Sequence, residues 1–195
     1  MKPEYAAAAM DAIAGLRHPR LDYRTAEAQS FAARWRPFLQ TVLFPGCRTL
    51  DLGCGAGKST FELEHLGAQA VGLDCSPGMI GLAREVAAAL GSSAEFHIGL
   101  FEALPFGENS FDLVWFPQNI IECSYAEMDQ IARQLGSVLR PGGKFCLTMA
   151  DGLKGLKTED TESPFDVLTV HSQIQRVLRR MEIARLVVSV FIDRE

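Results

Sequence analysis

The sequence predicts an α/β protein with a doubly wound, mostly parallel sheet of six or seven strands and helices on both faces. Two observations indicate this architecture. Short apolar runs alternate with segments of helical periodicity from about residue 47 onward. Glycine, proline and serine stand at the junctions between these segments, where strands and helices begin and end. Repeated strand–helix alternation is typical of parallel sheets that helices cover on both faces.

The length and composition predict one globular domain. The chain has 195 residues, of which 48% are hydrophobic and 22% charged, so it can form a single substantial core. The net charge of −5 argues against broad nucleic-acid binding. We interpret Arg176, Arg179 and Arg180 as a solvated helix face. Because Glu4 and Asp11 interrupt the first apolar stretch, we expect no secretory signal. The longest apolar stretches, such as residues 186–192, are far short of the roughly 18 residues of a membrane span, so we expect no membrane partner. The cysteine pattern described next predicts a cytoplasmic protein.

The cysteines and histidines predict neither disulfides nor a metal site. None of the five cysteines forms a C-x-x-C pair, so we interpret them as reduced thiols, most of them buried. The four histidines are scattered without metal-ligand spacing, and we expect no bound metal.

The elements are expected in three regions. Residues 1–45 are alanine-rich and predict a helical N-terminal lid or cap. Residues 46–150 predict the sheet and its helices, and residues 151–195 a short C-terminal part. The expected strands are 47–52, 69–74, 94–98, 111–116, 144–150 and 183–192. The expected helices within and after the core are 57–66, 76–90, 125–139 and 172–181, with 104–110 and 151–165 as loops.

Two of these helices have clear end signals. Ser76 suits an N-cap and Pro77 the first helical position, and Gly91 ends the same helix. Residues 141–143, Pro-Gly-Gly, are expected to end the helix at 125–139 and turn the chain into the next strand.

The most informative stretch is residues 51–60, which read Asp-Leu-Gly-Cys-Gly-Ala-Gly-Lys-Ser-Thr. An acid at the end of an apolar strand precedes three alternating glycines and a helix start, as in turns built around a nucleotide-like ligand. A phosphate-binding P-loop would need its first glycine at Leu52, and Gly53 comes one residue too late. A dinucleotide fold would need its third glycine at Lys58.

The observed spacing resembles the first motif of the class I S-adenosylmethionine (SAM) methyltransferases. Residues 71–80, Val-Gly-Leu-Asp-Cys-Ser-Pro-Gly-Met-Ile, are similar to the family's second motif, in which an acid at the strand end accepts hydrogen bonds from the ribose hydroxyls. Asp74 holds that position. Met79 resembles the apolar residue that packs on the adenine, although packing in the core is an equally good interpretation.

The third motif departs from the family pattern. Residues 99–106, Gly-Leu-Phe-Glu-Ala-Leu-Pro-Phe, place Leu100 where the family has an aspartate that accepts from the adenine amino group. Losing a charge-assisted hydrogen bond costs about 1.5–3 kcal/mol, roughly ten- to a hundredfold in affinity. Backbone groups of Leu100 and Phe101 remain able to bind the adenine edge. Residues 109–114 and 139–145 resemble signatures of the fourth and fifth strands.

The resemblance therefore implies SAM as cofactor, with S-adenosylhomocysteine (SAH) as its product. The residues that it implies for cofactor binding are Asp51, Gly53, Cys54, Gly55, Gly57, Asp74, Cys75, Met79, Leu100, Phe101 and Phe116.

The methyl acceptor is expected to be a small molecule. The segment after the fourth strand lies where the family's acceptor usually binds, so Gln118, Asn119 and Glu122 are the candidate acceptor contacts. Glu122 is also a candidate general base, and Tyr23 a second candidate catalytic residue in the N-terminal lid. Tyr5 and Trp35 lie in the same N-terminal segment, which often covers the cofactor in similar enzymes, and core packing is at least as good an interpretation for these two residues and for Tyr23. His171 is a further candidate base. The segment lacks the Asn/Asp-Pro-Pro-Tyr/Phe motif of enzymes that methylate DNA bases.

A second hypothesis is a catalytically inactive SAM-fold protein that acts as a binding or scaffold protein. Leu100 and the short C-terminal part motivate it, since the family commonly ends with two strands and the sequence predicts one. An exposed sheet edge would also favour a homodimer.

Overall fold

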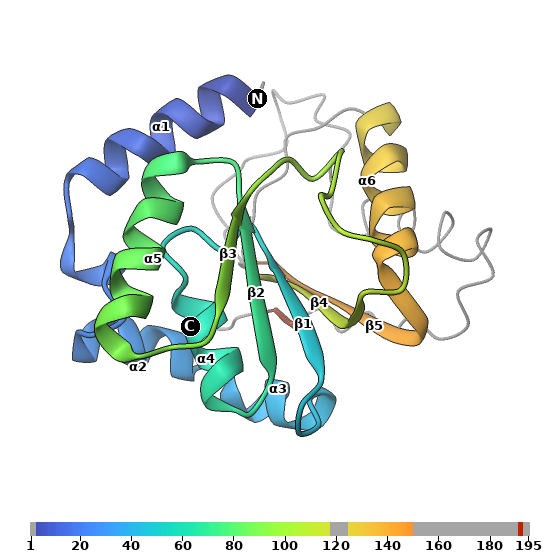
Figure 1. Cartoon of the computed structure of the whole chain (residues 1–195), viewed down its shortest axis with the longest axis horizontal. Helices are drawn as coiled ribbons and strands as arrows, with labels where there is room; N and C mark the ends of the chain where they lie inside the picture. Colours follow the sequence, from blue (N-terminus) through green and yellow to red (C-terminus); the bar gives the residue numbers. More distant parts are fainter. Residues whose placement is uncertain (1–2, 118–124, 150–190, 193–195) are drawn as a thin grey trace.

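A computed structural model describes residues 3–117, 125–149 and 191–192 of the chain (Figure 1). Its central feature is a parallel sheet in the strand order β3-β2-β1-β4-β5, with the two-residue β6 beside β5. The strands are β1 (Arg48–Leu52), β2 (Gln69–Asp74), β3 (Glu95–Ile98), β4 (Phe111–Pro117), β5 (Leu139–Met149) and β6 (Phe191–Ile192). The predicted parallel α/β architecture is confirmed. Of the strand expected at 183–192, only β6 lies within the described residues.

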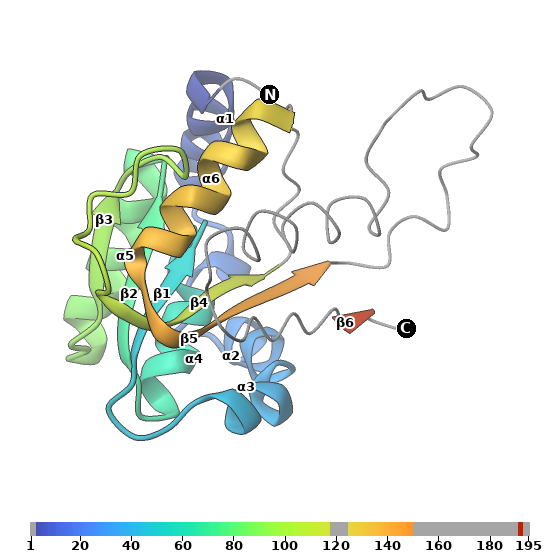
Figure 2. The same ribbon diagram turned by 90° about the vertical axis from the view of Figure 1, so that its right-hand side faces the viewer.

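Helices flank the sheet on both faces, as predicted. Viewed along the sheet, α1 and α5 lie on one side and α6 on the other (Figure 1), and the view from the side of α6 shows it in front of the strands (Figure 2). The helices are α1 (Pro3–Gly15), α2 (Ala26–Ala33), α3 (Arg36–Val42), α4 (Lys58–His65), α5 (Pro77–Leu90) and α6 (Tyr125–Val138), with a short 3-10 helix η1 (Pro19–Leu21).

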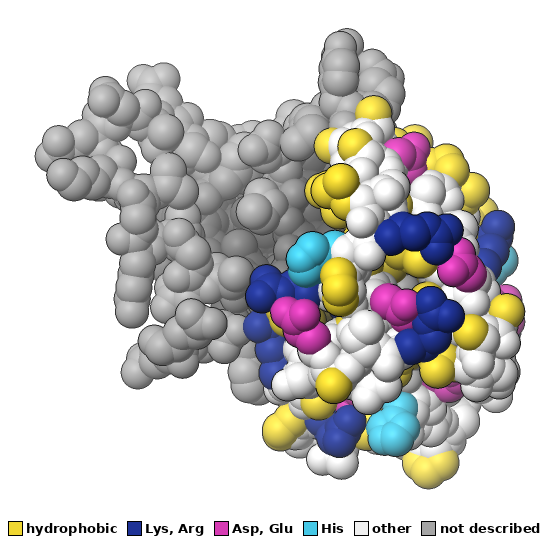
Figure 3. All heavy atoms as spheres, turned by 90° about the vertical axis from the view of Figure 1, so that its left-hand side faces the viewer, with side chains coloured by type: hydrophobic (Ala, Val, Ile, Leu, Met, Phe, Trp, Pro, Cys, Tyr) yellow, Lys and Arg dark blue, Asp and Glu magenta, His cyan; other side chains and the backbone are white. Residues whose placement is uncertain are grey.

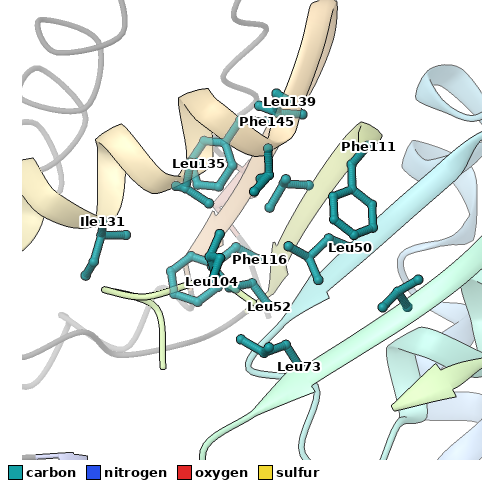
Figure 4. Packing of buried hydrophobic residues seen from close by; sticks show 13 residues of the cluster. Leu50, Leu52, Leu73, Leu104, Phe111, Phe116, Ile131, Leu135, Leu139 and Phe145 are labelled. Carbon is teal, nitrogen blue, oxygen red and sulfur yellow. The ribbon is translucent and has the colours of Figure 1, made fainter. Parts of the chain in front are cut away.

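The face beneath α6 carries one hydrophobic cluster. Side chains alternate between the two faces of a strand, so Leu50 and Leu52 of β1 point to the same side as Phe116 of β4. There they meet Ile131 and Leu135 of α6 (Figure 4). The residues between them on β1 therefore point to the opposite face, which places Asp51 beneath α4.

The opposite face is covered by α3, α4 and α5. Trp115 of β4 is fully buried there, and the rings of Trp35 and Phe38 lie 5.7 and 5.9 Å from its ring. Trp35 thus belongs to the core of this face. Tyr5 lies in α1, which confirms the helical character of the N-terminal region.

The start of β5 differs from the prediction. The strand was expected at residue 144, but it begins at Leu139, directly after α6. Leu139 pairs with Phe111 and Lys144 with Leu113, so an irregularity in the register absorbs the Pro-Gly-Gly stretch. Gly142 has a φ of +81°, which suits such a bulge. The stretch is therefore a bulge within the strand instead of a turn before it.

No helix within the described residues is long and apolar enough to span a membrane.

Candidate functional site

The candidate site lies at the carboxyl ends of the central strands. The chain continues from β1 to β2 on one side, and β4 lies on the other side of β1. Parallel sheets bind ligands at such a switch point, outside the carboxyl ends of the strands. The turn after β1, Asp74 at the end of β2 and the segment after β3 meet there.

The turn after β1 adopts the conformation that its glycines predict. Gly53, Gly55 and Gly57 have φ values of +73°, +54° and +85°. The N–H groups of Gly53 and Cys54 donate to the carbonyl of Leu73, at 2.8 and 3.0 Å, which attaches the turn to β2. A Cβ on Gly55 would meet nothing within 4 Å. The turn therefore leaves space that a ligand can approach closely.

Gly57 is required by the protein's own packing, and Gly57→Ala is expected to destabilise the fold. A Cβ there would lie 2.8 Å from the Phe96 ring, at a φ that disfavours L residues. We expect a loss of about 1–3 kcal/mol in urea unfolding. Gly81→Ala is the matched control, because Gly81 lies in α5 with open space around it. That change should stabilise by about 0.5–1 kcal/mol, and wild-type stability in Gly57→Ala would contradict the packing argument.

The carboxylate of Asp74 is held in place by two backbone groups. Its Oδ2 accepts from the N–H of Gly55 and its Oδ1 from the N–H of Ser76, both at 2.9 Å. The side chain is 8% exposed, so it is oriented but still reaches the surface of the site. Each oxygen retains a lone pair, and a diol could donate to both.

Asp51 is fully buried beneath the glycine turn. Its Oδ2 accepts from the hydroxyls of Ser59 and Thr60 on α4, at 2.7 and 2.6 Å, whereas its Oδ1 has no partner. Burial, with a smaller contribution from the charge of Asp74, raises the pKa of Asp51 to about 6, although the hydrogen bonds from Thr60 and Ser59 oppose the shift. A buried carboxylate oxygen without a partner is costly, and the negative charge beneath the turn favours a cationic ligand group above it.

Acidic groups dominate this end of the sheet. The pKa of the Cys75 thiol is raised by burial, then by the charges of Asp74, Asp11 and Glu102 nearby. The hydrogen-bond donors that the structure gives to Asp51 and Asp74 are all neutral groups. The site therefore suits a ligand that carries positive charge, such as SAM with its sulfonium and ammonium groups, and fits a polyphosphate poorly.

Lys58 does not act as a phosphate-binding lysine. Its ammonium lies over the ring of Phe31 on α2, 4.3 Å from the ring centroid. The N–H of Gly57 donates to the carbonyl of Cys54 at 2.9 Å, so the turn closes on itself. Burial, with Arg34 and Arg20 nearby, lowers the pKa of Lys58. The geometry agrees with the spacing argument against a P-loop.

The segment after β3 forms the third side of the site. The N–H of Gly99 donates to the carbonyl of Asp74 at 3.0 Å, and Leu100 is 40% exposed. Phe101 is partly buried and packs edge-to-face on Phe116, with ring centroids 5.4 Å apart. The position that carries an acid in the family pattern is thus an exposed leucine beside Phe101.

Three residues predicted for cofactor binding have side chains in the core. Met79 is 3% exposed and packs with Phe61, which favours the core interpretation. Phe116 is 2% exposed and supports Phe101 from the interior. The Cys54 side chain is 6% exposed and belongs to the same cluster as Met79, so only its backbone lines the turn.

Tyr23 is engaged in a contact that does not fit a catalytic base. Its hydroxyl donates to Glu62 at 2.9 Å, and Arg36 pairs with the same carboxylate at 2.7 Å. Burial and Glu62 raise the pKa of Tyr23 far above its usual range. A phenol that holds its proton so strongly is a poor base, and we do not retain Tyr23 as a catalytic candidate.

Tyr23→Phe is accordingly expected to lower the stability of the fold without changing cofactor affinity or turnover. Losing one hydrogen bond to a buried carboxylate should cost about 1–3 kcal/mol of unfolding free energy. The affinity for SAH should stay at the wild-type value in calorimetric titrations, and so should turnover of any acceptor. A large loss of turnover without a loss of stability would restore the catalytic role.

Other predicted residues lie outside the described part of the chain. These are the acceptor and base candidates and the C-terminal basic residues: Gln118, Asn119, Glu122, His171, Arg176, Arg179 and Arg180. Among the described residues, Cys47, Cys54, Cys75 and Cys146 are free thiols, and no cluster of His, Cys, Asp and Glu could hold a metal.

Four further residues hold the site together and were not predicted from the sequence. Ser59 and Thr60 orient Asp51, and their hydroxyls on the first turn of a helix after a buried acid could have signalled this. Two glutamines of α6 hold the segment after β3. Gln134 accepts from the N–H of Leu104 at 3.1 Å, and Gln130 donates to the carbonyl of Glu102 at 3.0 Å. No local pattern marks these two.

Comparisons with known proteins agree with this site. Residues 49–143 match the family model of a methyltransferase domain. An uncharacterized methyltransferase of Synechocystis sp. is 40% identical over 111 residues, which are 57% of this chain and 50% of that protein. The chain thus matches half of that relative's length.

Solved structures show the same fold. The PH0226 protein of Pyrococcus horikoshii has a TM-score of 0.60 and 35% identity, covering 66% of this chain and 61% of that one. A SAM-dependent methyltransferase of Methanosarcina mazei has a TM-score of 0.52 and 29% identity, covering 55% and 54%. Residues 49–143 are thus identified as a methyltransferase domain, and their fold and the glycine turn with its two acids are similar to those of the class I, SAM-dependent methyltransferases.

Proposed function

We propose that this protein binds SAM and transfers its methyl group to a small-molecule acceptor. One observation carries the proposal: two carboxylates, Asp51 and Asp74, flank an open glycine turn and have only neutral partners. This arrangement fits a cationic cofactor with a ribose. The M. mazei relative, described as SAM-dependent, supports the same cofactor.

In this proposal the chain binds and orients, because SAM supplies an already activated methyl group. Asp74 accepts from the ribose hydroxyls, and the negative charge of Asp51, buried beneath the turn, attracts the ammonium group. Gly55 allows close approach of the cofactor. Alignment of acceptor and methyl group, with exclusion of water, then accounts for most of the rate. We propose Gln118 and Asn119 as acceptor contacts and Glu122 as the base for a hydroxyl or amine acceptor.

A thermal-shift panel tests the cofactor. SAM and SAH should raise the melting temperature, since a ligand that binds only the folded state stabilises it in proportion to RT ln(1 + [L]/Kd). ATP and NAD should not, because their phosphates would face the acidic site. Stabilisation by ATP or NAD without stabilisation by SAH would reject the proposal.

A second assay separates the enzyme from a binding or scaffold protein. The exposed Leu100 at the adenine end motivates that alternative. Transfer of a labelled methyl group from SAM to members of a small-molecule library supports the enzyme. SAH binding with no transfer to any acceptor would favour the scaffold.

We also propose that the protein forms a homodimer, as expected for a sheet with an exposed edge. Sedimentation in the same buffers tests this, and a monomer at all concentrations would refute it.

A further inference from the structure

An acid of the N-terminal helix reaches the candidate site. The Oδ1 of Asp11, on α1, accepts from the hydroxyl of Ser76 and from the N–H of Gly78, the latter at 2.8 Å. Ser76 is fully buried, and its own N–H donates to Asp74 at 2.9 Å. Two hydrogen bonds through Ser76 therefore link Asp11 to the carboxylate predicted to hold the ribose.

We propose that Asp11 is a positioning residue for cofactor binding, which orients Asp74 through Ser76. The inference rests on the proposed function. Asp11 does not touch the expected ligand position itself. It holds the turn between β2 and α5 so that the Ser76 N–H keeps Asp74 in the orientation that binds a diol. A ligand group held in place before binding costs less ordering free energy on binding.

The contact is more than an ordinary helix cap. Ser76 already caps α5, because its Oγ accepts from the N–H of Met79 at 3.0 Å. Asp11 adds an acceptor for a second free N–H, that of Gly78, and a negative charge at the N-terminus of α5. The hydrogen bonds from Ser76 and Gly78 lower the pKa of Asp11, so it is ionised at neutral pH.

Gly78 shows that the helices approach closely at this point. A Cβ there would lie 2.9 Å from the Asp11 carboxylate and 3.3 Å from the Ala14 Cβ. A side chain at position 78 would therefore push α1 away from the turn. Gly78→Ala therefore provides a second variant that disturbs the contact between α1 and the turn without changing the residue at position 11.

The same helix has a second anchor that does not touch the site. In the turn directly after α1, both terminal nitrogens of Arg17 donate to Glu85 of α5, each at 3.0 Å. Both side chains are exposed, at 66% and 45%. The surface that carries α1 and α5 shows basic and acidic side chains side by side (Figure 3). Arg17→Gln thus loosens α1 without altering the turn, and it is the matched control.

The experiment compares SAH affinity by calorimetry in the full chain. Asp11→Ala and Gly78→Ala should each raise the Kd for SAH about tenfold, which corresponds to about 1.4 kcal/mol. Asp11→Asn keeps the acceptor oxygen and should stay within about threefold of wild type. Arg17→Gln should leave the Kd unchanged, even if its melting temperature falls. The single variant Ser76→Ala and the double variant Asp11→Ala/Ser76→Ala complete the set. The double variant should have a Kd for SAH no higher than the higher of the two single-variant values, because both changes act through the same contact.

The outcomes separate this inference from the proposed function. If the wild type binds SAH and Asp11→Ala binds it equally well, only the positioning role is refuted. An equal loss in Asp11→Ala and Arg17→Gln would also refute it, since general docking of α1 would then explain the effect. If the wild type itself does not bind SAH, the proposed function fails and this inference fails with it. Circular dichroism confirms that each variant is folded at the temperature of the titration.

Discussion

Asp74→Ala is expected to abolish the stabilisation of this protein by SAH. The carboxylate accepts from two backbone N–H groups, which aim it at the site and leave lone pairs for both ribose hydroxyls. Hydrogen bonds to a charged group contribute about 1.5–3 kcal/mol each, so losing two of them should weaken binding at least about a hundredfold. Thermal shift and calorimetry with SAH measure the effect directly.

Asp112→Ala is the matched control for this experiment. Asp112 lies near the start of β4, at the opposite end of the sheet from the site. It accepts from the N–H of Arg48 and from Arg140, each at 2.8 Å. Its removal should lower the melting temperature and leave the SAH shift intact. An undiminished SAH shift in Asp74→Ala would refute the ribose assignment.

Asp51→Asn is expected to stabilise the ligand-free protein at neutral pH and to weaken its binding of SAH. The pKa of Asp51 rises from an ordinary 3.8 to about 6 in the fold, mainly because the carboxylate is buried. The ionised form therefore opposes folding. A neutral amide removes that cost, which is at most about 3 kcal/mol for a shift of this size. The amide also loses the charge that would bind the ammonium group.

The raised pKa of Asp51 determines how its contribution to the free energy of unfolding changes with pH. Between about pH 4 and 6 the folded state holds the Asp51 proton more tightly than the unfolded state, so this group's contribution to stability falls as pH rises. Well below pH 3.8 the carboxyl is protonated in both states, and Asp51→Asn should match the wild type. Urea unfolding at about pH 3, 6 and 7.5 measures the difference. A variant that is less stable than wild type at pH 7.5 would contradict the account of Asp51.

Elements with strong local signals were predicted closely. Strand β2 has the predicted bounds, and α5 begins after Ser76 and ends at Gly91 in the left-handed conformation. Caps and turn glycines act within a few residues, so their sequence positions define where a helix begins and ends. The start of β5 was predicted wrongly because Pro-Gly-Gly suits a turn and a bulge equally well. Its pairing with β4 decided between them.

Roles that depend on the direction of a side chain were predicted less well. Met79 and Phe116 are near the predicted site in sequence, yet both side chains point into the core. Tyr23 was predicted as a catalytic candidate because it lies in the N-terminal region, but its hydroxyl donates to Glu62, 39 residues away. A motif match predicts where a residue lies along the backbone, whereas the packing of neighbouring elements determines what its side chain contacts.

The alternation of strands and helices, the glycine turn and the two acids at the ends of β1 and β2 could all be predicted from the sequence alone. These features depend on short-range preferences and on hydrophobic periodicity, which neighbouring residues encode. Only the tertiary structure showed that Asp51 has an unpartnered oxygen and that Asp11 reaches Ser76 across 65 residues of chain. Such contacts form where α1 packs on α5 and α4 on β1, because distant segments meet only when the whole core assembles.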